Sequence, residues 1–255
     1  AFAESFRSLL DQVDAKRNVL ATGVIKRQTM TIGAYSKPVE DVIAEIDAHH
    51  INMRIWERDA TVWKDHPTIA AKIRDRLGWL DVFSTIDIER LKALQAQAHA
   101  EDISHVVLLG MGGSSLAPEV LSQTFGPQPG YPRLLMVDST DPAYIRQIEN
   151  QIDLSRTLFL VASKSGGTIE TASFFKYFYE RTGERGAQFI AITDGGTSLE
   201  AEARAKGLRD VFVNPSDIGG RYSALSYFGL GPAAVVGFDL GSLWARAVRM
   251  AKAGG

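Results

Sequence analysis

The stretch HVVLLGMGGSSLAPEVL, residues 105–121, decides the fold of this chain. Its apolar run over residues 106–110 predicts a buried strand. A tight turn follows, and an apolar pattern at helical spacing begins after its three glycines, Gly110, Gly112 and Gly113. A strand, a glycine turn and a helix form half of a parallel α/β unit, whose turn presents backbone N–H groups to an anion, most often a phosphate.

The alternation of strand and helix continues along the chain. Apolar runs predict five strands, at residues 106–110, 133–138, 157–162, 188–193 and 211–214. Helical patterns follow the first four, at residues 115–125, 141–151, 168–181 and 198–206. Strands that each lead into a helix predict a parallel sheet covered on both faces. We therefore expect an α/β fold with three αβα layers and a five-stranded parallel sheet in the flavodoxin-like order 2-1-3-4-5.

An N-terminal helical segment precedes this predicted domain. Residues 1–20 have apolar side chains at helical spacing, residues 21–38 have the composition of a linker, and residues 38–100 predict several helices. Trp56 and Trp63 are seven residues apart, so we expect both on one face of one helix, packed in a core.

Composition excludes several classes of function. The 255 residues are 45 % hydrophobic and 23 % charged, which is typical of a globular protein with a sizeable core. The net charge of −2 favours neither nucleic acid nor a membrane surface as a partner. There is no cysteine, and the five histidines lack metal-binding spacing, so no disulfide and no metal site are expected. No apolar run is long enough to span a membrane and no signal peptide pattern begins the chain, so a cytoplasmic location is expected.

Polar loops meet where the predicted sheet would bind a ligand. In the order 2-1-3-4-5, the topological switch point lies between strands 1 and 3, beyond their carboxyl ends. The loop after strand 1 contains Ser114. The loop after strand 3, SKSGGTIET, adds three hydroxyls and an ammonium group, from Ser163, Lys164, Ser165 and Thr168. Two such loops at one crevice predict a phosphate-binding site, whereas either loop alone is also explained by helix capping.

The loop after strand 5, NPSDIGGRYSALS, contains a third group of candidates. Gly219 and Gly220 allow a close approach of the backbone to another group. Arg221 follows at a predicted helix start, where the helix dipole disfavours a cation, so Arg221 is a candidate for stabilising an anionic intermediate. A salt bridge between Arg221 and Asp217 is the alternative explanation.

Dinucleotide binding is the main alternative function. The pattern GMGGSS at residues 110–115 is close to the dinucleotide fingerprint, and Asp138 ends strand 2, where a ribose-binding acid would lie. However, serine replaces the third glycine or alanine, the loop at residues 163–171 has no role in this alternative, and no Walker A loop is present. Thr197 and Glu200, after strand 4, form a capping box and are assigned to helix initiation.

Three motifs, GMGGSSLAP, SKSGGTIET and NPSDIGGRYSALS, occur in this order over residues 105–230. In this order and context they resemble the glucose-6-phosphate isomerase family and its sugar isomerase (SIS) domain. Residues 38–100, with RIWERDATVWK and LGWLDV, resemble the helical segment that precedes this domain in bacterial members fused to transaldolase. AFAESFRSLLDQVDAKR resembles a transaldolase C-terminal helix. Together they indicate an N-terminal fragment of the isomerase part of a bifunctional transaldolase/glucose-6-phosphate isomerase.

The resemblance divides the chain into four parts. They are a transaldolase-like helix at residues 1–22, the helical segment of the isomerase at 23–100, an SIS domain that binds sugar phosphate at 101–235, and the start of a connection to a second SIS domain at 236–255. The family interconverts glucose 6-phosphate and fructose 6-phosphate without a metal or cofactor, in glycolysis, gluconeogenesis and the pentose phosphate pathway. The sugar ring opens, a base moves a proton between C2 and C1 through a cis-enediolate, and the ring closes.

The resemblance also implies roles for individual residues. Arg221 would stabilise the enediolate. Backbone at Gly112, Gly113 and Gly220 would approach the sugar. Ser165 stands where the commoner family pattern has threonine, which keeps the hydroxyl. The substrate phosphate would be held by five side chains, those of Ser114, Ser163, Lys164, Ser165 and Thr168.

One departure from the family pattern bears on activity. The family's catalytic glutamate, its ring-opening histidine and a late lysine lie in the second SIS domain, and no residue of this chain matches their motifs. We therefore expect the chain to bind sugar phosphates weakly and not to isomerise them, with the second SIS domain as a candidate partner. A regulatory SIS module that senses a sugar phosphate is the alternative, and an NAD-dependent oxidoreductase is a less favoured one.

Overall fold

The computed structural model describes residues 31–254 continuously, together with residues 6, 10, 13–14 and 17. Most of the helix predicted over residues 1–22 and residues 21–30 of the predicted linker lie outside the described residues, whereas residues 33–38 of that linker are helical. The four-part division of the chain therefore stays a prediction.

Contacts divide the chain at His50 into two compact units, residues 1–50 and 51–255. The described part of the first unit contains a 3-10 helix, η1 (Gly33–Tyr35), and helix α2 (Ser36–Ala48), and neither has a buried residue. All elements described below belong to the second unit.

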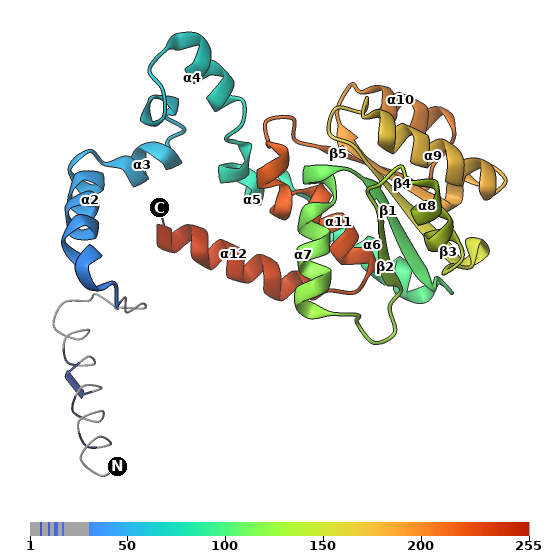
Figure 1. The fold of residues 1–255 in the computed structure, drawn as a ribbon, viewed down its shortest axis with the longest axis horizontal. Coiled ribbons are helices and arrows are strands. Elements are labelled where there is room, and N and C mark those ends of the chain that lie inside the picture. Colours follow the sequence, from blue (N-terminus) through green and yellow to red (C-terminus); the bar gives the residue numbers. More distant parts are fainter. Residues whose placement is uncertain (1–5, 7–9, 11–12, 15–16, 18–30, 255) are drawn as a thin grey trace. The chain divides into compact units, whose positions relative to one another are not determined.

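The second unit is built on a five-stranded sheet (Figure 1). All neighbouring strands pair in parallel in the order β2-β1-β3-β4-β5, which confirms the predicted order and fold class. Leu108 on β1 is in register with Met136 on β2 and with Leu160 on β3. The strands are β1 (His105–Gly110), β2 (Arg133–Val137), β3 (Thr157–Ala162), β4 (Phe189–Asp194) and β5 (Asp210–Asn214).

Helices cover both faces of this sheet, because successive strand residues point to opposite faces. Val107 and Leu109 pack in one core with α8 (Pro142–Glu149), α9 (Ile169–Arg181) and α10 (Ser198–Ala205). Val106 and Leu108 pack in the other core with α6 (Ile88–Ala100), α7 (Leu116–Phe125) and α11 (Tyr227–Val235). Both cores make the predicted three-layer arrangement.

Aromatic packing fixes α9 on the sheet. The ring of Phe159 on β3 stacks on Phe189 of β4 with 4.8 Å between centroids, and it meets Phe178 of α9 at 5.0 Å. All three side chains are fully buried. The loop that joins β3 to α9, which carries the predicted phosphate ligands, therefore begins and ends on rigid elements.

The segment before the sheet is helical, as predicted, but it is divided into short pieces: α3 (Ile51–Trp56), η2 (Ala60–Val62), α4 (Pro67–Arg74), η3 (Gly78–Asp81) and α5 (Val82–Thr85). The prediction that Trp56 and Trp63 share one helix is wrong. Arg58 adopts a left-handed backbone conformation with φ of 58°, which ends α3. Asp59 then begins a new turn, because its carboxylate accepts a hydrogen bond from the Thr61 N–H at 2.9 Å. Trp63 is 42 % exposed and is not a core residue.

The end of α4 is attached to the loop after β5. The Gly78 N–H donates to the Asp217 carbonyl at 3.0 Å, and Leu77 forms an antiparallel bridge with Ile218. A Cβ at Gly78 would lie 2.6 Å from Oδ2 of Asp217, so glycine allows this approach. Arg58 adds an ion pair to Asp217 at 3.4 Å. These contacts hold α4 beside the carboxyl edge of the sheet.

Helix α12 (Leu240–Gly254) ends the described chain, and its first turns pack on the core that contains Val106 and Leu108. Trp244 packs edge-to-face against Phe83 at 5.2 Å, and the indole N–H of Trp56 donates to the Gly254 carbonyl at 2.8 Å. In the part of the chain that the structure describes, no helix combines the length and apolar character that a membrane span requires.

Candidate functional site

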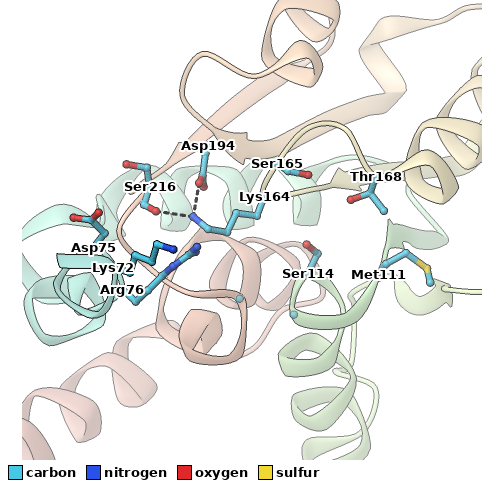
Figure 2. Close-up of a pocket in the computed structure, with 12 residues that line it drawn as sticks. Lys72, Asp75, Arg76, Met111, Ser114, Lys164, Ser165, Thr168, Asp194 and Ser216 are labelled. Carbon is cyan, nitrogen blue, oxygen red and sulfur yellow. Dashed lines mark hydrogen bonds and ion pairs between the residues drawn. The ribbon is translucent and has the colours of Figure 1, made fainter. Parts of the chain in front are cut away.

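The loops at the carboxyl edge of the sheet surround a pocket of about 820 Å³, a size typical of small-molecule sites (Figure 2). Six predicted site residues line it: Gly113, Ser114, Lys164, Ser165, Thr168 and Gly220. Three other predicted residues are not among the lining residues: Gly112, Ser163 and Arg221. Six lining residues were not predicted: Lys72, Asp75, Arg76, Met111, Asp194 and Ser216.

Glycines shape the loop after β1. Gly112 has a φ of 54°, which side chains other than glycine rarely adopt. A Cβ at Gly113 would lie 2.5 Å from the carbonyl carbon of Gly220 and 2.7 Å from its Cα, so the two backbones are in direct contact. The Ser223 hydroxyl lies 2.8 Å from the Gly113 carbonyl oxygen and 2.7 Å from that of Gly220, and it donates to this pair. Contact between the loops after β1 and β5 is thus a sufficient reason for glycine at position 113.

The loop after β3 orients the hydroxyl of Thr168 toward the pocket. Ser163 is 3 % exposed, and its hydroxyl donates to the Thr168 hydroxyl at 3.1 Å. Thr168 is the N-cap residue of α9, but its side chain makes no capping hydrogen bond. Gly166, with φ of 67°, packs so closely on the N-cap of α10 that a Cβ would lie 2.6 Å from Cβ of Thr197. Helix capping therefore does not explain the hydroxyl of Thr168, and Ser163 acts through Thr168.

Three hydroxyls gather at one end of the pocket, from Ser114, Ser165 and Thr168. Ser114 is 8 % exposed and comes from the loop after β1, whereas the other two come from the loop after β3. Among the residues drawn in Figure 2, no hydrogen bond joins Ser114 or Thr168 to another lining side chain. Thr168 also stands directly before α9, where the helix dipole favours an anion. This end of the pocket has the groups that a phosphate needs.

Lys164 points toward the other end of the pocket. Its ammonium group forms an ion pair with Asp194 at the end of β4 and donates to the Ser216 carbonyl at 2.7 Å (Figure 2). Burial raises the pKa of Asp194, and the hydrogen bond from Lys164 opposes that rise. In this structure Lys164 therefore joins the loops after β3, β4 and β5, and it does not point at the three hydroxyls.

Arg221 lies in the 3-10 helix η7 (Gly220–Leu225), and its side chain is exposed. It is absent from the pocket lining, and within residues 31–254 it forms no ion pair with Asp217. Asp217 pairs with Arg58 instead. In this structure Arg221 thus neither lines the pocket nor forms the alternative salt bridge, and its role towards an anionic intermediate stays a prediction.

Sequence reasoning did not find the positive charges of α4. Lys72 is on α4, and Arg76 follows its last turn, four residues later. Their i, i+4 spacing indicates a shared helix face, but nothing in the periodicity shows that this face meets the edge of the sheet. Asp194 had a stronger signal, because it ends β4, which pairs with the strand that Ser163 follows.

The groups expected for other ligand classes do not gather here. Asp138, the candidate ribose-binding acid, is exposed and is not a lining residue. No cluster of three or more histidine, aspartate or glutamate side chains suited to a metal occurs within the described ranges. What the pocket offers is a set of hydroxyls at one end and a set of cations at the other.

A family model described as phosphoglucose isomerase matches residues 45–250 of this chain. The chain belongs to the phosphoglucose isomerase family. The match includes helices α3 to α6 as well as the sheet, so the helices that precede the sheet belong to the same family model.

Individual relatives agree with this assignment. A glucose-6-phosphate isomerase of a Synechococcus species is 30 % identical over 95 % of this chain and 44 % of its own length. A glucose-6-phosphate isomerase of Thermus thermophilus is 35 % identical over 66 % of this chain and 41 % of its own length. The chain thus spans less than half the length of these phosphoglucose isomerases.

Solved structures show the same relation. A hypothetical protein of Thermus thermophilus superposes with a TM-score of 0.68 at 29 % identity, over 86 % of this chain and 51 % of that protein. A glucose-6-phosphate isomerase of Chlamydia trachomatis superposes with a TM-score of 0.51 at 28 % identity, over 72 % of this chain and 35 % of that enzyme. The described fold is therefore one that phosphoglucose isomerases share.

The contact between Gly113 and Gly220 leads to a stability prediction. Gly113→Ala is expected to lower the free energy of unfolding by about 1–3 kcal/mol, because the new methyl group would overlap the Gly220 backbone. Gly167→Ala is the matched control, since nothing lies within 4 Å of a Cβ there, and a change within about 0.5 kcal/mol is expected. Urea unfolding followed by circular dichroism measures both. Equal stability of the two variants would mean that the loops do not meet at Gly113.

Asp194 leads to a prediction about pH. Its pKa is raised above the ordinary value of 3.8, so the folded chain keeps a proton that the unfolded chain has lost. The free energy of unfolding of the wild type should therefore fall as pH rises from about that value through the folded-state pKa. Asp194→Asn cannot titrate, so its stability relative to the wild type should increase with pH over this range, as measured by urea unfolding at a series of pH values.

Lys164→Gln is the companion variant for this experiment. It removes the hydrogen bond that lowers the pKa of Asp194, so the fall in stability should extend to higher pH than in the wild type. A constant difference between wild type and Asp194→Asn at every pH would contradict the raised pKa.

Proposed function

We propose that this chain is the phosphate-binding half of a glucose-6-phosphate isomerase and that it binds glucose 6-phosphate and fructose 6-phosphate. The observation that carries the proposal is the meeting of Ser114 and Thr168 in one pocket, from two loops that the sequence separates by more than fifty residues. Membership of the phosphoglucose isomerase family supports the choice of a hexose phosphate as the ligand.

In this proposal the phosphate lies among the hydroxyls of Ser114, Ser165 and Thr168. Hydrogen bonds to a charged group contribute about 1.5–3 kcal/mol each, so three of them would supply most of the affinity for a small ligand. The N-terminus of α9 adds a favourable dipole. Ser163 keeps the Thr168 hydroxyl in place without touching the phosphate.

The same pocket provides little for proton transfer. Isomerisation needs a base that moves a proton between C2 and C1, and the lining carboxylates are Asp75 and Asp194. Asp194 is paired with Lys164, Asp75 stands at the end of the pocket away from the hydroxyls, and no lining residue is a histidine. We propose that this chain alone binds the substrate but does not isomerise it, and that the base comes from a second SIS domain.

The small number of acid–base groups in the pocket is also consistent with the alternative function, a regulatory module. A regulatory module that senses a sugar phosphate needs the hydroxyls of the pocket but no base. Joining this chain to a second SIS domain distinguishes the two proposals, because isomerase activity should appear only if the chain is half of an enzyme.

Thr168→Val tests the binding site with little change of shape. Loss of one hydrogen bond to a charged phosphate should raise the dissociation constant for glucose 6-phosphate by about 10–100-fold. Ser173→Ala on an exposed part of α9 removes a hydroxyl that, among the described residues, donates only to the Ile169 carbonyl, so it should leave affinity unchanged. Calorimetric titration with glucose 6-phosphate measures both, with glucose as the ligand that lacks phosphate. Unchanged binding by Thr168→Val would contradict the placement of the phosphate among the hydroxyls of Ser114, Ser165 and Thr168.

Isomerase activity of the purified chain is expected to be absent. A coupled assay that oxidises glucose 6-phosphate as it forms from fructose 6-phosphate measures the activity directly. Thr168→Val, purified in the same way, shows how much activity comes from contaminating host enzyme. Activity in the wild type well above that of the variant would contradict the proposal that the base lies elsewhere.

A further inference from the structure

The end of the pocket opposite the hydroxyls is lined by positive charge. Lys72 reaches it from α4, Arg76 from the residues directly after α4, and Lys164 from the loop after β3. Figure 2 shows the nitrogen atoms of Lys72 and Arg76 directed toward the ammonium group of Lys164, whereas Ser114 and Thr168 lie on the far side of Lys164. The phosphate cradle and these cations therefore occupy different parts of one pocket.

Two of these cations form no ion pair among the described residues, although Arg76 lies near enough to Asp194 to lower the pKa of that carboxyl. Lys164 is paired with Asp194, but neither Lys72 nor Arg76 forms an ion pair with any carboxylate in the range 31–254. The other lining carboxylate, Asp75, leaves one positive charge in excess, from three cations and two acids. Like charges that face one space repel one another, and an anion between them relieves that repulsion.

The chain beside Arg76 is fixed to the loop after β5. Its Cδ lies 3.9 Å from where a Cβ of Gly219 would be, so the aliphatic part of the side chain runs beside the loop after β5. The next two residues, Leu77 and Gly78, are bonded to Ile218 and Asp217 of that same loop. Attraction to the dipole at the end of α4 would explain a cation near the helix end, but it does not direct the cation into the pocket.

We propose that Lys72 and Arg76 form a second anion subsite, and that the pocket binds sugars with two separate phosphate groups more tightly than sugars with one. The proposal rests on the proposed function, because the first phosphate occupies the hydroxyl cradle. The cations at this end exceed the carboxylates by one charge, which favours an anion there, and the guanidinium of Arg76 offers a second phosphate a planar pair of donors. The pocket volume of about 820 Å³ accommodates a phosphate at each end of a six-carbon chain.

A matched pair of ligands tests the second subsite without interference from chemistry. Glucitol 6-phosphate and glucitol 1,6-bisphosphate have no carbonyl group and differ only in the second phosphate. By calorimetric titration at fixed pH and salt, the wild type should bind the bisphosphate about tenfold or more tightly than the monophosphate. Equal affinities for the two ligands would overturn the second subsite and leave the proposed function intact.

Variants of Lys72 and Arg76 locate the second phosphate. Arg76→Gln and Lys72→Gln should each reduce the preference for the bisphosphate, and the double variant should bring the two affinities to within about threefold, with affinity for the monophosphate nearly unchanged. Arg76→Lys should restore part of the preference. Arg74→Gln is the matched control, because Arg74 is an exposed cation of the same helix that does not line the pocket.

The remaining outcomes separate this inference from the proposed function. A bisphosphate preference that persists in the double variant would mean that the second phosphate binds elsewhere and would overturn the inference. Binding of neither glucitol phosphate by the wild type would overturn both. Near-ultraviolet circular dichroism of each variant checks that a loss of preference is not a loss of fold.

Discussion

The close approach of two backbones, at Gly113 and Gly220, is the constraint on which the pocket depends. The loops after β1 and β5 come from the two sides of the sheet's centre, and only the absence of a side chain at Gly113 lets them touch. Ser223 then shares its hydroxyl hydrogen between the two carbonyls, which satisfies groups that would otherwise be costly to enclose. Because Gly113 and Gly220 both line the pocket, this contact fixes part of the pocket wall.

The ion pair between Lys164 and Asp194 gives the pocket its two ends. Asp194 is 9 % exposed, and one of its oxygens is buried without a hydrogen-bond partner among the described residues, so burying it has a cost that its raised pKa reflects. The carboxylate of Asp194 holds the ammonium of Lys164 away from the hydroxyls, and the Ser216 carbonyl accepts a hydrogen bond from the same ammonium. Neutral donors are thus left at one end and full positive charges at the other.

Local patterns predicted the sheet well, and long-range contacts explain what they missed. Each strand is a short apolar run and each crossover a separate helical pattern, so the order around β1 and β3 followed from general rules. The hydroxyls of Ser114, Ser165 and Thr168 were found because loops at the carboxyl ends of neighbouring parallel strands must converge. Lys72 and Arg76 were missed because the docking of α4 depends on Gly78 and Asp217, which are far apart in the sequence and have no shared period. The single helix expected through Trp56 and Trp63 failed for a local reason, the left-handed residue Arg58 and the new turn begun by Asp59.

Trp79 follows α4 in the turn η3, and its indole stacks on the ring of Tyr222, with 5.6 Å between centroids and 15° between planes. Tyr222 belongs to the loop after β5, two residues beyond Gly220, whereas Trp79 lies in η3, directly after the segment that carries Lys72 and Arg76. The two rings therefore report on the relative position of the segments that carry the pocket's cations and its glycine contact. A displacement of either segment would change the solvent and the neighbour that the indole experiences, so the fluorescence of Trp79 reports whether the two segments keep this relative position.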